Sequence, residues 1–373
     1  MRFPGFEEEW EEKRLEQICS NFKAGNAITA SSISPSGEYA VYGGNGLRGY
    51  TNTYNYDGRF VLIGRQGALC GNINSVEGKN YISEHAIAIG GTEISDIKWL
   101  EFKLYSMNLG RLSESSAQPG LSVEKLKDIK ILVPTQLIEQ QKMAALLSLL
   151  DEKIETQNKI IEELKLLKNT LVDRIFNPLG NSFLRFPGFL EEWQTYSYSE
   201  IFDVSGKRNI ENDITNVLSA SQTYGMIERE SIGIDIKYEK ASLASYKIVE
   251  PGDYIIHLRS FQGGFAFSDK KGICSPTYVV LKSNSIIEYS FLREYFVSQT
   301  FIQSLKLVTY GIRDGRSINI EEFLKLEICI PPVEEQVKII NFISTMTQKI
   351  NEANILVKLL QRQKQFLLEK MFI

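Results

Sequence analysis

Histidine and cysteine, which often supply nucleophiles, proton relays and metal ligands, are sparse in this chain. The two histidines are His85 and His257, and the four cysteines stand singly without a C-x-x-C pair. One histidine in each half does not readily complete a Ser-His-Asp site. Isolated cysteines lack the paired spacing of a zinc site. Unpaired cysteines in a chain this long are instead typical of a reducing cytoplasm.

Three further motifs fall short of catalytic sites. Asn177-Pro178 lacks the second proline and the aromatic residue of an amino-methyltransferase loop, so it is interpreted as a helix stop. The glycine-rich residues 43–46 lack the Gly-Lys-Ser/Thr of a phosphate loop. Glu335 and Lys338 have the spacing of an exposed pair on one helix face. We therefore predict no catalytic constellation, no metal site and no cofactor bound by this chain.

An arginine and a glutamine follow a short apolar run in each half of the chain. Residues 59–65 (RFVLIGR) lead into Gln66-Gly67, and residues 253–259 (DYIIHLR) lead into a loop containing Gln262-Gly263. Each run predicts a buried strand that delivers Arg65 or Arg259 to a loop.

The segments that would position these side chains occur twice in the sequence. Residues 2–6 (RFPGF) recur 183 residues later as residues 185–189, and the pair Glu139-Gln140 recurs 196 residues later as Glu335-Gln336. A period near 190 residues excludes solenoids, whose periods are about 20–50 residues. The chain is therefore a tandem duplication of a domain followed by a helix. The ends of the two copies are alike and their middle parts differ, as expected of two different recognition modules.

Each copy closes with a predicted long helix. Residues 137–176 contain no glycine or proline, and their apolar residues follow a heptad repeat that the second copy shares. The predicted seam consists of Leu147, Leu150, Ile154, Ile161, Leu164, Lys168 and Leu171 in the first copy, and of Ile343, Met346, Ile350, Val357, Leu360, Lys364 and Leu367 in the second.

About 38 residues would form a helix of about 55 Å. The apolar stripe along a helix of this length is too long for one domain to bury. The simplest packing partner of each helix is therefore the other helix. The two lysines would weaken this coiled coil but fix its register. The alternative is an ordinary amphipathic surface helix on each domain.

Composition limits the class of protein. The 373 residues suggest two or three domains, and 42 basic against 46 acidic residues give a formal charge of −4. This balance excludes a strongly basic protein that coats polyanions, and 43% hydrophobic residues exclude an acidic disordered chain. An aromatic content of 11% favours β-rich domains. No secretory signal or apolar run of about 18 residues is present, so we expect a cytoplasmic protein without a membrane association.

The order of these motifs resembles the specificity subunits of type I restriction–modification systems, known as the HsdS family. Residues 41–50 (VYGGNGLRGY) are followed by Gly120-Leu121-Ser122, an Ile-Leu-Val-Pro strand, Glu-Gln and a long helix. The resemblance covers the full chain. The second copy departs from the pattern, with Arg316-Ser317-Ile318 in place of Gly-Leu-Ser and residues 224–227 (YGMI) as a looser version of the Tyr-Gly-Gly-Asn phrase.

The resemblance implies an α+β fold with a pseudo-two-fold internal duplication. Residues 1–137 and 183–332 would be two similar β-rich target-recognition domains. Residues 138–182 and 333–373 would form an antiparallel coiled coil between them.

The resemblance also implies a subunit without catalysis of its own. Each recognition domain would read one half of a bipartite, asymmetric target in double-stranded DNA, and the helices would set the spacing between the half-sites. The helices would also dock two methyltransferase subunits that use S-adenosylmethionine to methylate adenine. Motor-nuclease subunits would bring ATP, Mg²⁺ and DNA cleavage.

Candidate DNA contacts are loop residues whose side chains can hydrogen-bond to bases or phosphates. Arginine suits guanine, and asparagine or glutamine suits adenine. The candidates are Asn45, Arg48, Tyr50, Arg65, Gln66, His85 and Gln118 in the first domain, and Gln222, Tyr224, Arg259, Gln262, Arg313 and Arg316 in the second. Each could equally be structural. Arg65 and Arg259 are favoured because the repeat places both at the same position.

Two other interpretations stay open at this point. A two-domain protein–protein scaffold on a coiled coil fits the acidic balance, whereas the missing motifs argue against a stand-alone methyltransferase or nuclease. Neither recognition domain is basic on its own, so positive charge must be concentrated on one face of each domain. We therefore expect weak non-specific DNA binding by the isolated chain.

Overall fold

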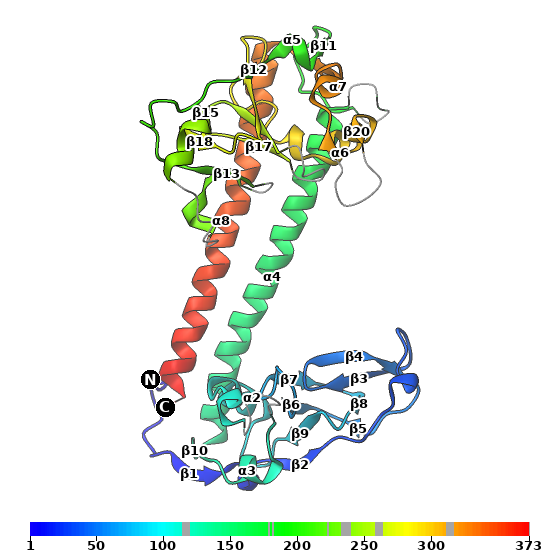
Figure 1. Cartoon of the computed structure of the whole chain (residues 1–373). Coiled ribbons are helices and arrows are strands. Elements are labelled where there is room, and N and C mark those ends of the chain that lie inside the picture. The colour runs from blue at the N-terminus through cyan, green and yellow to red at the C-terminus, as the bar shows by residue number, and fades with distance from the viewer. Residues whose placement is uncertain are drawn as a thin grey trace. The chain divides into compact units, whose positions relative to one another are not determined.

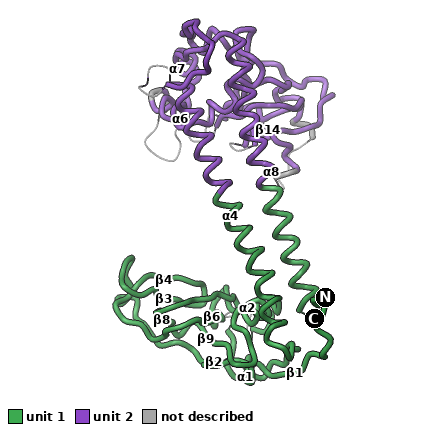
Figure 2. The backbone as a smooth tube through the Cα atoms, turned by 180° about the vertical axis from the view of Figure 1, so that it is seen from behind, with its two compact units in different colours: residues 1–159, 354–373 green, residues 160–353 purple. Residues whose placement is uncertain are grey.

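The computed structural model describes residues 1–113, 120–177, 180, 183–221, 224–232, 240–257, 264–310 and 317–372. The chain forms two compact units, residues 1–159 with 354–373 and residues 160–353. Each unit contains one β-rich domain together with parts of two long helices, α4 (Leu137–Ile175) and α8 (Val333–Met371) (Figure 2). We call these unit 1 and unit 2.

Two four-stranded sheets make up most of the domain in unit 1 (Figure 1). The first has the order β2-β9-β6-β7, with β2 at Ser20–Ala24, β9 at Ala86–Gly90, β6 at Phe60–Gly64 and β7 at Ile73–Val76. The second has the order β4-β3-β8-β5, with β4 at Gly46–Thr51, β3 at Tyr39–Gly43, β8 at Lys79–Ile82 and β5 at Tyr56–Asp57. Strands β3 and β8 are parallel, and the other pairs are antiparallel.

The apolar run of residues 59–65 forms β6, as predicted, and it is buried on both faces. Val61 and Ile63 face a core that also contains Trp99 of α2 (Ile97–Ser106), whereas Leu62 faces a second cluster with Ile82. This division follows from the two-residue period of a strand. Because both faces are covered, the sequence shows a continuous apolar run instead of an alternating one.

Short elements complete the domain in unit 1. Strand β1 (Glu11–Arg14) pairs antiparallel with β10 (Lys130–Val133), so the first and last strands lie side by side. The remaining helices are α1 (Leu15–Ile18), α3 (Val123–Lys127), η1 (Ala30–Ser32) and η2 (Leu109–Leu112).

Unit 2 repeats this plan with different sheets. Strand β11 (Gln194–Ser197) pairs with β22 (Glu327–Ile330), as β1 does with β10. The four-stranded sheet has the order β12-β19-β16-β17, at Phe202–Ser205, Val279–Ser283, Tyr254–Ile256 and Phe265–Phe267. The two-stranded sheets are β13 (Leu218–Ser221) with β14 (Gly225–Glu228), β15 (Lys247–Val249) with β18 (Gly272–Cys274), and β20 (Thr309–Tyr310) with β21 (Ser317–Ile318).

An aromatic core fills the domain in unit 2. Phe296 and Phe301 lie within ring-contact distance of each other and of Phe265, and Tyr198 stacks on Phe323 with ring centroids 4.6 Å apart. The helical turns that carry or flank these residues are α5 (Tyr198–Ile201), α6 (Gln299–Ser304), α7 (Ile320–Leu324), η3 (Arg229–Ile232), η4 (Lys240–Ser245), η5 (Tyr295–Val297) and η6 (Leu305–Leu307). The predicted α+β class and internal duplication are confirmed.

The two long helices run antiparallel within each unit. In unit 1, Leu147 near the start of α4 shares a core with Leu367 near the end of α8. In unit 2, Val172 near the end of α4 shares a core with Ile339 near the start of α8. All fourteen predicted seam positions are buried or partly buried, whereas most of the residues between them are exposed. The apolar seam thus packs partly against the other helix and partly against the β-rich domains.

The two lysines of the heptad pattern bind acidic partners. Lys364 binds Asp151 of α4, and its ammonium group lies 5.3 Å from the ring centroid of Phe102 in α2. Lys168 binds Glu294, which lies next to η5 in the domain of unit 2, at 2.7 Å. Each lysine therefore links a helix to its β-rich domain, and Lys168 finds its partner outside the helix pair.

Candidate nucleic-acid interface

Several strand ends converge at one edge of the domain in unit 1. Because β3 and β8 are parallel, they end together, and the backbone N–H of Ser83 donates to the carbonyl of Tyr42 at 2.8 Å. Strands β6 and β9 are antiparallel, with Gly64 opposite Ala86, so β6 ends where β9 begins. This edge therefore gathers the β3–β4 turn, the loop after β6 and residues 83–85.

Two glycines allow these segments to approach closely. A Cβ atom on Gly44 would lie 2.8 Å from the carbonyl oxygen of His85 and 3.0 Å from the Cα of Gly64. A Cβ atom on Gly64 would lie 2.9 Å from the carbonyl oxygen of Gly44. Real side chains do not fit at such distances, so both positions require glycine. This contact explains Gly44 of the Gly-Gly-Asn-Gly phrase, a reason that the sequence alone did not reveal.

Arg65 has a fixed backbone, and its side chain has no partner among the described residues. Its N–H donates to the carbonyl of His85 at 2.9 Å. Its carbonyl accepts from the N–H of Leu121 at 2.9 Å and from the Cys70 thiol at 3.3 Å. Arg65 is half-buried, and within the described part of the chain no ion pair or hydrogen bond holds its guanidinium group. A rigid backbone that presents a free guanidinium group is suited to binding an external acceptor.

Gln66 and His85 are in direct contact at the same edge. The Nδ1 atom of His85 lies 3.2 Å from Oε1 of Gln66, and its Nε2 atom lies 3.3 Å from Oε1 of Glu84. The other carboxylate oxygen of Glu84 accepts from the N–H of Ile28 at 3.3 Å. Gln66 is exposed and also forms a bridge with Gly120, the first residue of the Gly-Leu-Ser phrase.

The remaining candidates of the first domain lie on or beside the β3–β4 hairpin. Asn45 is exposed in the turn, and Arg48 is exposed on β4. Tyr50 lies further along β4 and is half-buried, with backbone hydrogen bonds to Ser34 in both directions. The structure thus brings Asn45, Arg65, Gln66 and His85 together, with Arg48 nearby and Tyr50 farther off. Gln118 lies outside the described residues.

Only one candidate of the second domain falls within the described residues. Tyr224 is 71% exposed at the turn between β13 and β14, where its N–H donates to Oγ of Ser221 at 3.3 Å. The others, Gln222, Arg259, Gln262, Arg313 and Arg316, lie outside the described residues.

An aromatic and cationic group on the second sheet of unit 1 was missed by sequence reasoning. The rings of Tyr39 and Tyr54 lie 5.0 Å apart, and the ammonium group of Lys79 lies 4.8 Å from the Tyr54 ring. Aromatic rings beside a cation are suited to nucleic acids, because bases stack on such rings. The dense tyrosines of residues 50–56 were the available signal, but they gave no indication of which rings meet.

The Glu-Gln pair of each copy has a structural role. Glu139 is buried, and its two carboxylate oxygens accept from Nε and Nη2 of Arg2 at 2.8 Å each. In unit 2, Glu335 binds Arg185 in the same way and also accepts from Nε1 of Trp193 at 3.1 Å. These hydrogen bonds raise the pKa of both arginines.

The expectation that Glu335 and Lys338 form an exposed pair is therefore wrong. Glu335 is fully buried and is neutralised by the arginine of the repeated RFPGF segment. A helical spacing of three residues could not reveal this partner, which lies 150 residues away in the sequence.

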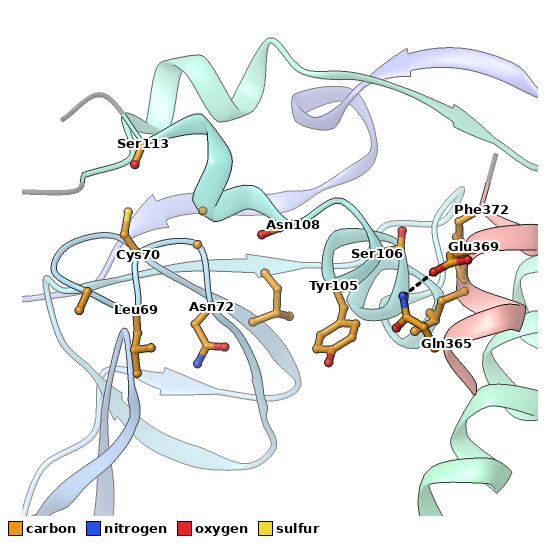
Figure 3. A pocket seen from close by; sticks show the side chains of 15 residues that line it. Leu69, Cys70, Asn72, Tyr105, Ser106, Asn108, Ser113, Gln365, Glu369 and Phe372 are labelled. Atoms are coloured by element: carbon orange, nitrogen blue, oxygen red, sulfur yellow. Dashed lines mark hydrogen bonds between the residues drawn. The ribbon is translucent and has the colours of Figure 1, made fainter. Parts of the chain in front are cut away.

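A pocket of about 720 Å³ lies beside this edge, within unit 1. Its lining includes Leu69, Cys70 and Asn72 after the Arg65 loop, and Gln365 and Glu369 near the end of α8 (Figure 3). Burial raises the pKa of the Cys70 thiol. Among the described residues, no group of three or more histidine, cysteine or acidic side chains could hold a metal ion. The helices described are also too short or too polar to cross a membrane.

Comparisons with known proteins identify the family. The model of the type I restriction modification DNA specificity domain matches residues 7–166 and again residues 190–361. A type I restriction enzyme specificity subunit from Escherichia coli is 38% identical over 175 residues, which are 46% of this chain and 42% of that relative. A putative specificity subunit from Haemophilus influenzae is 22% identical over 93% of this chain and 90% of its own.

A solved structure has the same fold over the whole chain. The crystal structure of a type I restriction–modification S subunit from M. genitalium covers 100% of this chain and 97% of its own, with a TM-score of 0.64 and 16% identity. The matched part of the E. coli relative is less than half of that protein's length.

Proposed function

Because the chain belongs to the family of type I restriction–modification DNA specificity subunits, we propose that it reads a bipartite target in double-stranded DNA. The domain of unit 1 reads one half-site and the domain of unit 2 reads the other. Catalysis lies in the partner subunits of such systems.

The observation that carries this proposal is the edge at which Asn45, Arg65, Gln66 and His85 converge. It holds a hairpin turn with an exposed asparagine, an arginine without a partner among the described residues, and a glutamine on a fixed loop. Arginine and glutamine are the side chains that distinguish base pairs in the major groove, which admits a two-stranded ribbon. A catalytic role is not needed to explain any of them.

The long helices support two further parts of the proposal, which are the spacing between the half-sites and the docking of partner subunits. Each is a continuous helix of 39 residues that enters both units, so its length would set the distance between half-sites. Large apolar side chains remain exposed on both helices, among them Leu166 at 68%, Ile355 at 57% and Phe366 at 53%. Exposed apolar patches mark protein interaction sites, and we assign these to two methyltransferase subunits that bring S-adenosylmethionine. Motor-nuclease subunits with ATP and Mg²⁺ complete the proposed system.

The protein–protein scaffold is not favoured, because the family match covers both copies. Methylome sequencing of the host with and without this gene tests the main proposal. Loss of a bipartite adenine-methylation motif on deletion is expected, and an unchanged methylome would contradict it.

Replacement of Arg65 tests the assignment of the first domain. We expect Arg65→Ala to relax one position of one half-site and to leave the other half-site intact, because a guanidinium–base contact specifies one base pair. Arg59→Ala is the matched control, since Arg59 is exposed just before the opposite end of β6. The methylation motif of each variant is the measurement. A uniform loss of methylation across all sequences would instead indicate a phosphate contact.

A further inference from the structure

His85 restrains which atoms Gln66 can offer to a ligand. The Nδ1 atom of His85 faces the amide oxygen of Gln66, which is only an acceptor, so the tautomer with a proton on Nδ1 donates to Gln66. The Nε2 atom of the same ring lies 3.3 Å from a carboxylate oxygen of Glu84.

The position of His85 is fixed by its backbone. Its carbonyl accepts from the N–H of Arg65, and a Cβ atom on Gly44 would lie only 2.8 Å from the same oxygen. The backbone of residues 65 and 66 is fixed in turn by the hydrogen bond from the N–H of Leu121 to the carbonyl of Arg65 and by the bridge to Gly120. Histidine and glutamine thus meet on two anchored segments.

The contact occupies one acceptor site of the Gln66 amide oxygen and uses neither of its two N–H donors. A free glutamine reads adenine by accepting from N6 and donating to N7, which uses both the oxygen and the nitrogen of its amide. With His85 on its oxygen, Gln66 offers its two N–H donors more readily than its acceptor. Two N–H donors match the two major-groove acceptors of guanine, N7 and O6. Adenine offers only one acceptor there and places its own donor beside it.

We propose that His85 is a specificity-determining positioning residue that restricts Gln66 to guanine at one position of the first half-site. This inference rests on the proposed DNA reading by the first domain. The ring itself acts through Gln66 and need not touch a base.

The test uses the full chain with its methyltransferase subunits and determines the methylation motif of each variant. We expect His85→Ala to relax one position from guanine to either purine, because the freed amide oxygen can accept from adenine. We expect the discrimination against adenine to fall by about tenfold or more, the range of one bidentate contact. Gln66→Ala should relax the same position to all four bases, and the double variant should match Gln66→Ala alone.

The conservative variant distinguishes positioning from a merely structural role. His85→Asn places an amide N–H close to where Nδ1 stands, so it should restore the preference for guanine. A His257→Ala variant in the second domain should leave this position unchanged, since that ring packs on Tyr278 in unit 2.

Two negative outcomes are distinguishable. If Gln66→Ala changes the motif but His85→Ala does not, or His85→Ala relaxes a different position, the role of His85 is refuted while DNA reading by the domain stands. If Arg65→Ala and Gln66→Ala both leave the motif unchanged, the proposed reading by the first domain fails as well.

Discussion

Single side chains in this protein are held in place by partners that are distant in sequence. Gln140 is fully buried, and its amide donates to the carbonyls of Ile94 and Pro134 at 3.0 Å each. Its oxygen accepts from the N–H of Asp96 at 2.8 Å, which fixes the start of α2. Gln336 makes the equivalent set of bonds in unit 2. Within each unit, the repeated Glu-Gln pair therefore connects the first turn of a long helix to the β-rich domain.

Replacement of Gln140 should destabilise unit 1. Gln140→Leu removes three hydrogen bonds and leaves largely buried polar backbone groups without partners, so we expect the free energy of unfolding to fall by about 2–4 kcal/mol. Urea denaturation of the full chain, followed by tryptophan fluorescence, measures the change. The neighbouring Gln141 is exposed, so Gln141→Leu is the matched control. Equal effects of the two variants on the free energy of unfolding would contradict this structural role of Gln140.

At the scale of elements, each recognition domain is bound to both long helices. The core of unit 1 combines Trp99 of α2 with Met143 of α4 and Phe372 after α8. The core of unit 2 combines Phe291 with Phe176 after α4 and Ile343 of α8. Lys364 and Lys168 add ion pairs at equivalent positions of the repeat. A domain held by both helices at once should follow any change in their length.

Lengthening both helices should change the spacing of the target and not its half-sites. Inserting seven residues after Lys159 of α4 and after Ala353 of α8 keeps the heptad phase and adds about 10 Å of helix. We expect the gap between half-sites to grow by up to about three base pairs, at 3.4 Å per base pair.

The methylation motif of this variant is the measurement, and inserting seven residues into α4 alone is the control that shifts the helices out of register. An unchanged gap in an active variant would refute the role of the helices as a spacer.

Over the whole molecule, the duplication extends to the way each domain follows a helix. In unit 2, the N–H of Leu184 donates to the carbonyl of Arg174 near the end of α4. In unit 1, the amino group of Met1 donates to the carbonyl of Lys370 near the end of α8. Met1 and Leu184 hold the same place before the RFPGF segment, and Lys370 is equivalent to Arg174 in the repeat. The contact between the segment before RFPGF and the end of a long helix is thus repeated in both copies.

The charge of the whole chain leads to a prediction about its DNA affinity. A formal charge of −4 supplies little long-range attraction, and non-specific binding depends on the phosphates that a protein neutralises. We expect weak binding by the isolated chain at about 0.15 M salt and tight binding only with the methyltransferase subunits present. A salt titration of both forms measures this. Tight, sequence-blind binding by the chain alone would contradict it.

The sequence by itself determined the duplication, the long helices and the strand that leads to Arg65. These features are local or periodic, so they are visible in residue order. It could not determine which side chains meet. The partners of Glu139, Gln140, Lys168 and His85 come from segments that only the folded strand order brings together. Burial of Glu335 could not be predicted from its helix, because its compensating charge lies in another element. Only the tertiary structure shows that the Gln66 amide contacts His85, the contact on which its proposed role depends.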